Sequence, residues 1–234
     1  MNEPQFWMGG RLATDLIAIT HDPKDIDSGF WAITTTFDGE FTAAKFGKVV
    51  DAEWRDSYQP LSNNNWESSH SKESYCQLVE EFRQQIADGN VYQVNACRII
   101  SSECSQPLLG LSSKLLEGNP AKFGGYLSLP NIEIASASPE RFISRINQTI
   151  MTSPVKGTRP LGSDGEFGEK DRSENIMIVD LMRNDLGQIC VENTISVPRL
   201  LATEIHPGLE HLVSDVIGDL KARVGWTEIL RALM

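Results

Sequence analysis

Short runs of apolar residues, separated by clusters of Asp, Gly and Pro, occupy much of this 234-residue chain. Near the N-terminus they are residues 16–19, 30–33 and 41–46. Such a pattern predicts the strands of an antiparallel sheet joined by turns. Asp38-Gly39, between the second and third runs, predicts a hairpin. In the second half of the chain, strands are predicted at residues 122–128, 132–136, 142–146 and 149–152.

Residues 72–88 form the clearest predicted helix. Their apolar positions recur at the 3.6-residue spacing of one helix face: Tyr75, Leu78, Val79, Phe82 and Ile86. Ser71 fits the N-cap and Gly89 the end of this helix. Further helices are predicted over residues 170–185 and 227–234, and a strand-like run over residues 91–101.

The charge balance opposes anionic partners. The chain carries a formal net charge of −11 and has a sequence pI of about 4.8. Its summed field repels phosphate backbones, so nucleic acid is not an expected partner. A small anionic substrate would need a local cluster of basic residues or a divalent cation.

No segment of the sequence predicts a signal peptide or a transmembrane helix. The apolar residues from Phe6 are interrupted at Gly9-Gly10-Arg11, which leaves no signal-peptide core, and no run of about 18 apolar residues occurs. The four cysteines show neither a metal-binding spacing nor a disulfide framework. We therefore expect a cytoplasmic protein without membrane association.

Glu140 lies in Ser138-Pro139-Glu140-Arg141-Phe142, where one predicted strand ends and the next begins. Proline fixes the turn. A carboxyl group held there and partly removed from water can act as a general acid. The alternative is a solvated glutamate paired with Arg141.

Lys156 stands between Pro154 and Pro160 and is followed directly by Gly157. The backbone of such a loop can approach a ligand closely, and an amine removed from water becomes a nucleophile. An exposed loop lysine is the alternative.

Asp171 and Glu174 are three residues apart in the first turn of the predicted helix at 170–185. Carboxylates there either complement the helix dipole or coordinate a hard cation. Residues 176–182 are almost wholly apolar, so this helix is expected to pack on most sides. His211, with apolar neighbours, is either a structural histidine or a substrate contact.

Taken in order, these segments resemble the chorismate-utilising enzymes, the family of the anthranilate, aminodeoxychorismate, isochorismate and salicylate synthases. The resemblance covers residues 66–234, and several motifs in the family's order carry it. They are Gly89-Asn90-Val91-Tyr92-Gln93-Val94-Asn95, Ser138-Pro139-Glu140-Arg141-Phe142, Pro154-Val155-Lys156-Gly157-Thr158-Arg159, residues 170–185 and Glu210-His211-Leu212-Val213-Ser214.

The resemblance implies an α+β fold in which antiparallel β-sheets pack face to face with helices outside. We accordingly expect residues 1–234 to form a single, incomplete chorismate-binding domain. Residues 1–65 would be its shortened N-terminal portion, and residues 66–234 the region that matches the family.

Two positions imply which reaction is catalysed. Isochorismate and salicylate synthases typically carry a water-activating lysine where this chain has Gln93, which favours ammonia as the nucleophile. Anthranilate synthases usually have alanine where this chain has Lys156, whereas aminodeoxychorismate synthases have lysine. The implied reaction is amination of chorismate at C4 to 4-amino-4-deoxychorismate, on the route to p-aminobenzoate and folate. Anthranilate synthesis is the runner-up.

The resemblance also implies a role for each site residue. Lys156 attacks C2 while Glu140 protonates the departing C4 hydroxyl, and ammonia then enters at C4 and expels the lysine. Glu174 is implied as a ligand of a Mg²⁺ ion that binds a chorismate carboxylate, with Asp171 nearby through water. Three further positions are implied to contact the substrate: Gln93, Thr158 and His211.

The chain departs from the family pattern in two regions of the site. The family continues beyond position 234 with glycine-rich segments and with further glutamates that complete the Mg²⁺ site, and the segment between Thr158 and Lys170 is shorter here than usual. A glutamine amidotransferase subunit is the implied source of ammonia, since nothing in the chain resembles a glutaminase. A rival hypothesis is a catalytically incompetent fragment that acts only as a binding domain.

Overall fold

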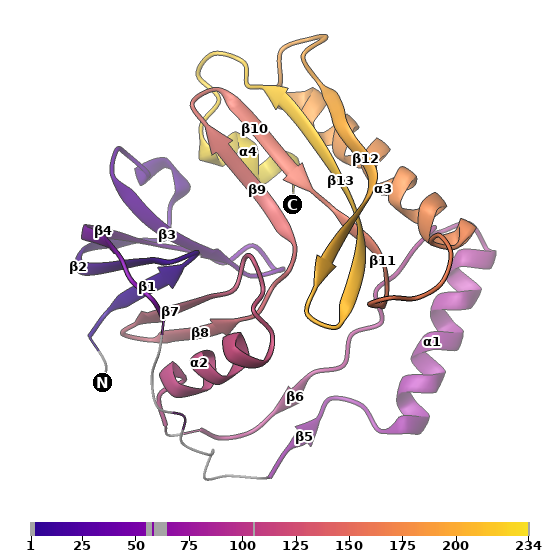
Figure 1. Cartoon of the computed structure of the whole chain (residues 1–234), viewed down its shortest axis with the longest axis horizontal. Helices are drawn as coiled ribbons and strands as arrows, with labels where there is room; N and C mark the ends of the chain where they lie inside the picture. The colour runs from indigo at the N-terminus through magenta and orange to yellow at the C-terminus, as the bar shows by residue number, and fades with distance from the viewer. Residues whose placement is uncertain (1–2, 55–57, 59–64, 105, 234) are drawn as a thin grey trace. The chain divides into compact units, whose positions relative to one another are not determined.

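The computed structural model describes residues 3–54, 58, 65–104 and 106–233. The chain divides into two compact units, one made of Met1–Tyr58 with Leu108–Met234 and the other of Gln59–Pro107. The larger unit contains two antiparallel sheets and their helices, and the described residues of the smaller unit form one helix and a short strand pair (Figure 1). The predicted α+β class with antiparallel sheets and helices is confirmed.

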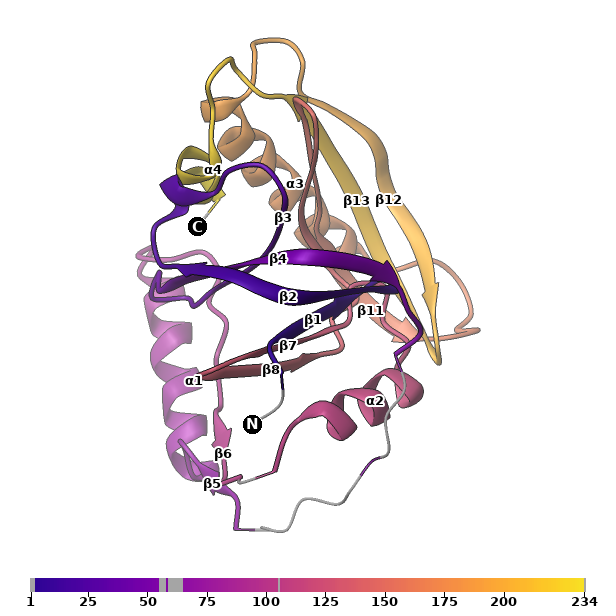
Figure 2. The same ribbon diagram turned by 90° about the vertical axis from the view of Figure 1, so that its left-hand side faces the viewer.

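The first sheet of the larger unit has six antiparallel strands in the order β3-β4-β2-β1-β7-β8 (Figure 2). The elements of this region are β1 (Gln5–Met8), β2 (Arg11–Thr20), η1 (Pro23–Asp25), β3 (Phe30–Thr35), β4 (Phe41–Asp51), α2 (Leu109–Gly118), β7 (Gly125–Leu129) and β8 (Ile132–Ser136). The predicted hairpin at Asp38-Gly39 joins β3 to β4. The sheet has its own apolar core, formed by Ala13, Ala32, Ala44, Phe46, Leu127 and Leu129.

The second sheet has five strands and centres on β13 (Leu209–Asp219). Along one edge, β13 pairs with β10 (Thr149–Ser153) and then β11 (Val155–Pro160), and along the other it pairs with β12 (Ser196–His206). The outer strand β9 (Arg141–Ile146) pairs with β10. Short turns join β9 to β10, β10 to β11 and β12 to β13, whereas α3 connects β11 to β12. The pairing of β10 and β11 with β13 brings residues 149–160 beside residues 209–219.

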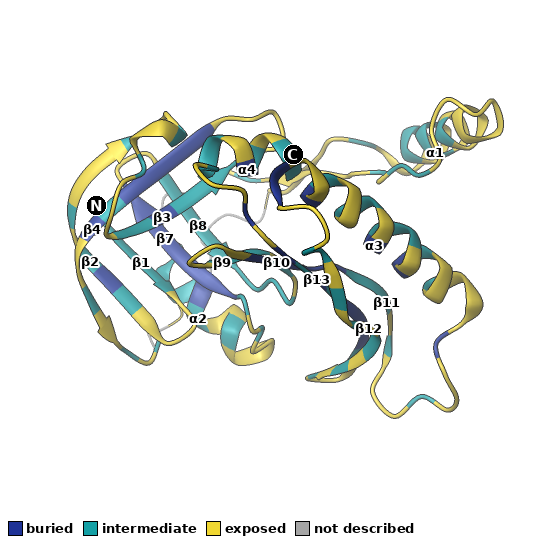
Figure 3. Cartoon of the chain, turned by 90° about the horizontal axis from the view of Figure 1, so that it is seen from above, coloured by how far each residue is buried: buried dark blue, intermediate teal, exposed yellow. Residues whose placement is uncertain are grey.

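The helices α3 (Glu169–Ile189) and α4 (Trp226–Leu233) share a second core with this sheet. Buried and exposed positions alternate along α3, as expected of a helix that covers one face of a sheet (Figure 3). The predicted helices at 170–185 and 227–234 are thus confirmed, and α3 is longer than predicted. The sequence pattern missed α2, because Gly110 and two serines interrupt its leucines. None of the helices in the described ranges is long and apolar enough to cross a bilayer.

The smaller unit confirms one prediction and overturns another. Helix α1 spans Lys72–Ala87, the Ser71 side chain accepts a hydrogen bond from the backbone N–H of Ser74, and Gly89 follows the end of the helix. The strand predicted over residues 91–101 is wrong except for β6 (Ile100–Ser101), which pairs with β5 (Glu67–Ser68). An extended segment forms a strand only where it finds a hydrogen-bonding partner, and β5 reaches only the last two residues of this run.

Candidate active site

Strand β13 has one face toward the helix layer and the opposite face toward the candidate site. On the first face, Leu212 and Ser214 are buried, and both are bonded to Asn175 of α3. Asn175 Nδ2 donates to Leu212 O over 3.1 Å, and Ser214 Oγ donates to Asn175 Oδ1 over 2.5 Å. Because side chains alternate along a strand, His211, Val213 and Asp215 share the opposite face.

His211 lies between side chains of both neighbouring strands. Thr158 on β11 and Glu204 on β12 are its direct register partners. The Thr158 Oγ1 atom is 2.8 Å from His211 Nδ1, and the His206 ring meets the His211 ring edge-on, with centroids 4.6 Å apart. Burial, with the nearby His206 in second place, lowers the pKa of His211 below its usual value, while Glu204 and Glu140 oppose this shift.

Glu140 is held beside the strand that carries Lys156. The backbone N–H of Val155 donates to Glu140 Oε1 over 2.9 Å, so the carboxyl group is fixed one residue away from Lys156. The β10–β11 junction makes this possible, since Pro154 separates the two strands and leaves Val155 N–H directed at Glu140. Lys156 itself is half-buried. The contact places Glu140 against the backbone one residue before Lys156, and Glu140 is exposed, so the partial removal of its carboxyl group from water is not found.

Gly157 brings the start of α3 against the Lys156 segment. Its φ is +89°, a conformation that side chains rarely adopt. A Cβ atom placed on Gly157 would lie 2.9 Å from Asp171 Cβ and 3.2 Å from Phe167 Cδ1. Only glycine permits this approach, so Asp171 is adjacent to the backbone that follows the candidate nucleophile.

Arg159 holds the short segment between β11 and α3 against the sheet. Arg159 Nε donates to Glu210 Oε2 over 2.7 Å and Arg159 Nη1 donates to Gly165 O over 2.7 Å. The guanidinium lies over the Phe167 ring at 4.4 Å. The hydrogen bond from Arg159 also lowers the pKa of Glu210. This segment therefore lies against the sheet at the end next to the site.

Asp171 and Glu174 supply oxygen ligands of the kind that a hard cation prefers. The Glu174 side chain is 34% exposed, and its Oε1 lies 3.8 Å from Lys170 Nζ. Within residues 3–54, 58, 65–104 and 106–233, no group of three or more His, Cys, Asp or Glu side chains gathers in a way that could hold a metal. These two carboxylates fit Mg²⁺ by their chemistry, since Mg²⁺ keeps several waters and takes one or two protein carboxylates.

Gln93 belongs to the Gln59–Pro107 unit, where it is half-buried in the irregular segment between α1 and β6. The other six predicted site residues all lie in the larger unit. Glu140, Lys156, Thr158, His211 and Asp171 occur on segments that contact one another, and Glu174 follows one turn along α3.

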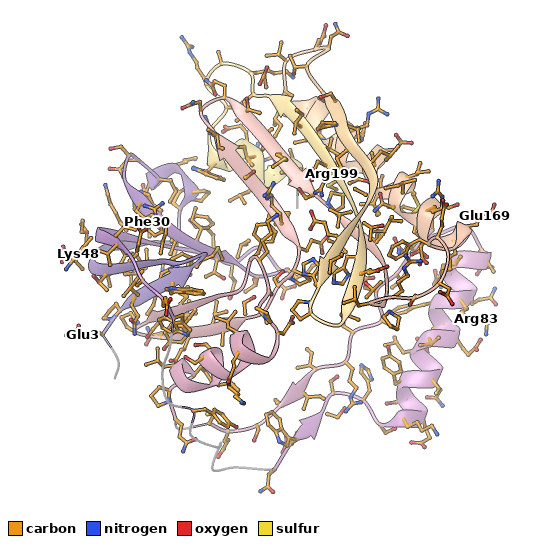
Figure 4. All side chains as sticks on the ribbon, in the orientation of Figure 1. Glu3, Phe30, Lys48, Arg83, Glu169 and Arg199 are labelled. Atoms are coloured by element: carbon orange, nitrogen blue, oxygen red, sulfur yellow. The ribbon has the colours of Figure 1, made fainter. Side chains whose placement is uncertain are left out.

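An ion-pair network that sequence reasoning missed lies on the same face of β13. Arg199 Nε and Nη2 bind Asp215 Oδ2 and Oδ1 at 2.7 and 3.1 Å, and Arg199 Nη1 lies 2.6 Å from Glu204 Oε1. Ser153 Oγ also donates to Asp215, over 2.7 Å. The Asp215 hydrogen bond raises the pKa of Arg199. Figure 4 labels Arg199 on this sheet. The partners are 5 to 62 residues apart in sequence, so only the strand register reveals the network.

Two cavities differ in their relation to these residues. One of about 640 Å³ is lined by Trp7, Trp54, Tyr58 and four residues of α2, and none of the candidate site residues lines it. A much smaller one, about 10 Å³, lies on the candidate face and is lined by Pro139, Val155, Arg199, Glu204, Val213 and four neighbours. Arg199 and Glu204 of the ion-pair network line the smaller cavity, and, in the described part of the chain, none of the seven predicted site residues is among the residues that line either cavity.

Known proteins are similar to this chain in both sequence and fold. A model of the chorismate binding enzyme family matches residues 40–234. The chain is 35% identical over 179 residues to aminodeoxychorismate synthase component 1 of Escherichia coli (strain K12), a match that covers 72% of this chain and 40% of that protein. It is 34% identical over 177 residues to anthranilate synthase component 1 of Saccharolobus solfataricus, covering 71% and 42%.

A solved structure shares the fold of this chain. A putative 2,3-dihydroxybenzoate-specific isochorismate synthase from Bacillus anthracis superposes with a TM-score of 0.69 at 19% identity, covering 99% of this chain and 71% of the other. The chain spans about 40% of the length of the first curated relatives it matches. Because the family model matches most of its residues, the chain belongs to the chorismate binding enzymes.

Proposed function

We propose that this chain carries the catalytic centre of an aminodeoxychorismate synthase component 1, which aminates chorismate at C4 to give 4-amino-4-deoxychorismate for p-aminobenzoate and folate synthesis. The observation that supports the proposal is the contact between Glu140 and the backbone N–H of Val155, the residue before Lys156. Aminodeoxychorismate synthase relatives at 30–39% identity support the same assignment.

In the proposed first step, the neutral Lys156 amine forms a bond to C2 of chorismate as the ring double bonds shift and the C4–oxygen bond breaks. Glu140 gives its proton to the departing hydroxyl, which leaves as water, and then takes a proton from the alkylated amine. Glu140 Oε1 already accepts the Val155 N–H, so Oε2 is the oxygen that carries the proton.

In the second step, ammonia adds at C4, the double bonds shift back and the C2–nitrogen bond to Lys156 breaks. The proton lost by the new amine returns to Lys156, so the balance is chorismate plus ammonia to aminodeoxychorismate plus water. Thr158 and His211, on adjacent strands, are proposed to contact the ring. Asp171 and Glu174 would hold Mg²⁺, which when bound neutralises a substrate carboxylate.

Ammonia is proposed to come from a glutamine amidotransferase subunit, as the name component 1 of the relatives implies a second component. The relative from Saccharolobus solfataricus favours a second candidate, anthranilate synthase component 1. The two products separate the candidates, because anthranilate forms by amination at C2 with loss of pyruvate.

The test is a product assay with chorismate, Mg²⁺ and ammonium, with and without an added aminodeoxychorismate lyase. p-Aminobenzoate that appears only with the lyase supports the proposal, and anthranilate formed without it supports the second candidate. No turnover by a chain that is folded by circular dichroism would favour the binding-domain hypothesis.

A lysine variant tests the residue roles. Lys156→Ala is expected to abolish or divert amination at C4 while Mg²⁺ binding, measured by calorimetry, stays close to that of the unaltered chain. Lys114→Ala, which removes an exposed lysine of α2 that pairs with Glu117, is the matched control and should leave the yield unchanged. An unchanged yield from Lys156→Ala would remove this residue from the mechanism.

A further inference from the structure

We infer that His206, held by Glu204, is a positioning residue that keeps the neighbouring His211 ring uncharged and turned toward Thr158. The bearing of this role on catalysis rests on the proposed function. The histidine pair itself is a property of the fold and can be measured without turnover.

The strand register places these side chains on one face of the sheet. Thr158, His211 and Glu204 form a row across β11, β13 and β12, because Thr158 and Glu204 are the direct partners of His211. His206 is two residues beyond Glu204, on the same face and diagonal to His211. The pair His206 and Leu209 closes the β12–β13 hairpin.

The hairpin turn leaves His206 little freedom. Pro207 fixes one backbone angle, and Gly208 has a φ of +75°. The His206 side chain is 9% exposed and its ring stands at 72° to that of His211, with centroids 4.6 Å apart. An edge-on contact at this distance restricts rotation of the His211 ring, whose Nδ1 is directed at Thr158 Oγ1.

Glu204 is itself fixed by the Arg199 network. Its Oε1 lies 2.6 Å from Arg199 Nη1, and Arg199 is held in turn by two contacts to Asp215. The second oxygen, Oε2, lies 3.8 Å from His206 Nε2. A carboxylate at this distance helps to hold the His206 ring in place against His211.

Two imidazolium rings at 4.6 Å repel each other, so a proton on His206 opposes a second one on His211. The charged groups that face His211 are His206 and Glu204 on β12 and Glu140 before β9. The two carboxylates act against the effect of His206 and of burial, and the balance lowers the pKa of His211. Because Nδ1 is engaged by Thr158, a neutral ring leaves Nε2 to donate or accept one hydrogen bond with a polar group of the proposed substrate.

The experiment is a long-range ¹H–¹⁵N NMR titration of the ¹⁵N-labelled chain. The chain has four histidines, so substitution of each in turn assigns the spectrum.

His206→Gln is expected to raise the titration midpoint of His211 by about half a unit or more, the size expected when one like charge is removed at this distance. His206→Phe keeps a ring against His211 but removes the charge, so it should raise the midpoint as well and serves where the glutamine variant does not fold. His21→Gln, at the residue directly after β2, is the control and should leave His211 unchanged.

A His211 midpoint that stays constant or falls in His206→Phe would show that His206 only fills space. In the amination assay, the acid limb of the pH–rate profile should move upward with His206→Phe by the same interval as the NMR midpoint. Because the titration needs no chorismate, failure of the amination assay and failure of this inference are separate results.

Discussion

Asn175 is expected to be the most costly polar residue of α3 to replace. It is fully buried, donates to Leu212 O over 3.1 Å and accepts from Ser214 Oγ over 2.5 Å. Asn175→Ala removes two hydrogen bonds worth about 1 kcal/mol each and leaves a small cavity with a hydroxyl that has lost its acceptor. The free energy of unfolding should fall by about 2–4 kcal/mol, a large share of the 5–15 kcal/mol typical of a domain.

The assay is urea unfolding followed by circular dichroism, read as a lower midpoint with an unchanged slope. Asn184→Ala, at an exposed position of the same helix, is the matched control and should change stability by less than about 0.5 kcal/mol. Asn175→Asp should destabilise more than alanine, because it buries a charge beside the strand. A loss below about 0.5 kcal/mol in Asn175→Ala would refute the reasoning that this side chain fixes α3 on β13.

Three further outcomes follow from the structure. Gly157→Ala should destabilise the chain by about 1–3 kcal/mol, seen as a lower thermal midpoint, and reduce product formation. The cause is the new methyl group, which sits at a positive φ and meets Asp171. An unaltered melting curve would contradict this. Gly187→Ala, whose methyl would only touch a neighbour at 3.9 Å, should stabilise the chain by about 0.5–1 kcal/mol in urea unfolding. Burial acts to raise the pKa of Asp215, but hydrogen bonds led by that of Arg199 outweigh it and lower the pKa from 3.8. The ionised Asp215 therefore stabilises the folded chain above pH 3.8, and this contribution is lost as the pH falls through the lower pKa of the folded state. Arg199→Gln should make acid unfolding begin at a higher pH. An acid-unfolding transition at the same pH would argue against the network.

The sequence allowed the local elements to be predicted, but it did not show which strands pair with one another. The helix at Lys72–Ala87 was predicted with its Ser71 cap because apolar spacing and capping act within a few residues. The run at 91–101 contains β-formers, yet its partner strand covers only two of its residues, which no local pattern reveals. Partner availability, more than propensity, therefore decided where strands formed.

The candidate site shows the same division. The resemblance singled out Glu140, Lys156, Thr158 and His211 one motif at a time, and the structure places Thr158 against His211 and Glu140 against Val155. Arg199 and its partners went unnoticed because they meet only through the register of β12 with β13.

The two faces of β13 separate the requirements for folding from those for chemistry. Leu212, Ser214 and Val216 are buried on the helix side, whereas His211 and Asp215 lie on the other side. In a saturation library along this strand, substitutions at Leu212, Ser214 and Val216 should therefore reduce soluble expression, and those at His211 and Asp215 should reduce product formation. Val213 is buried on the site face and should affect expression as well. In such a strand, the residues of the site face can change between related proteins while the residues of the helix face stay constant.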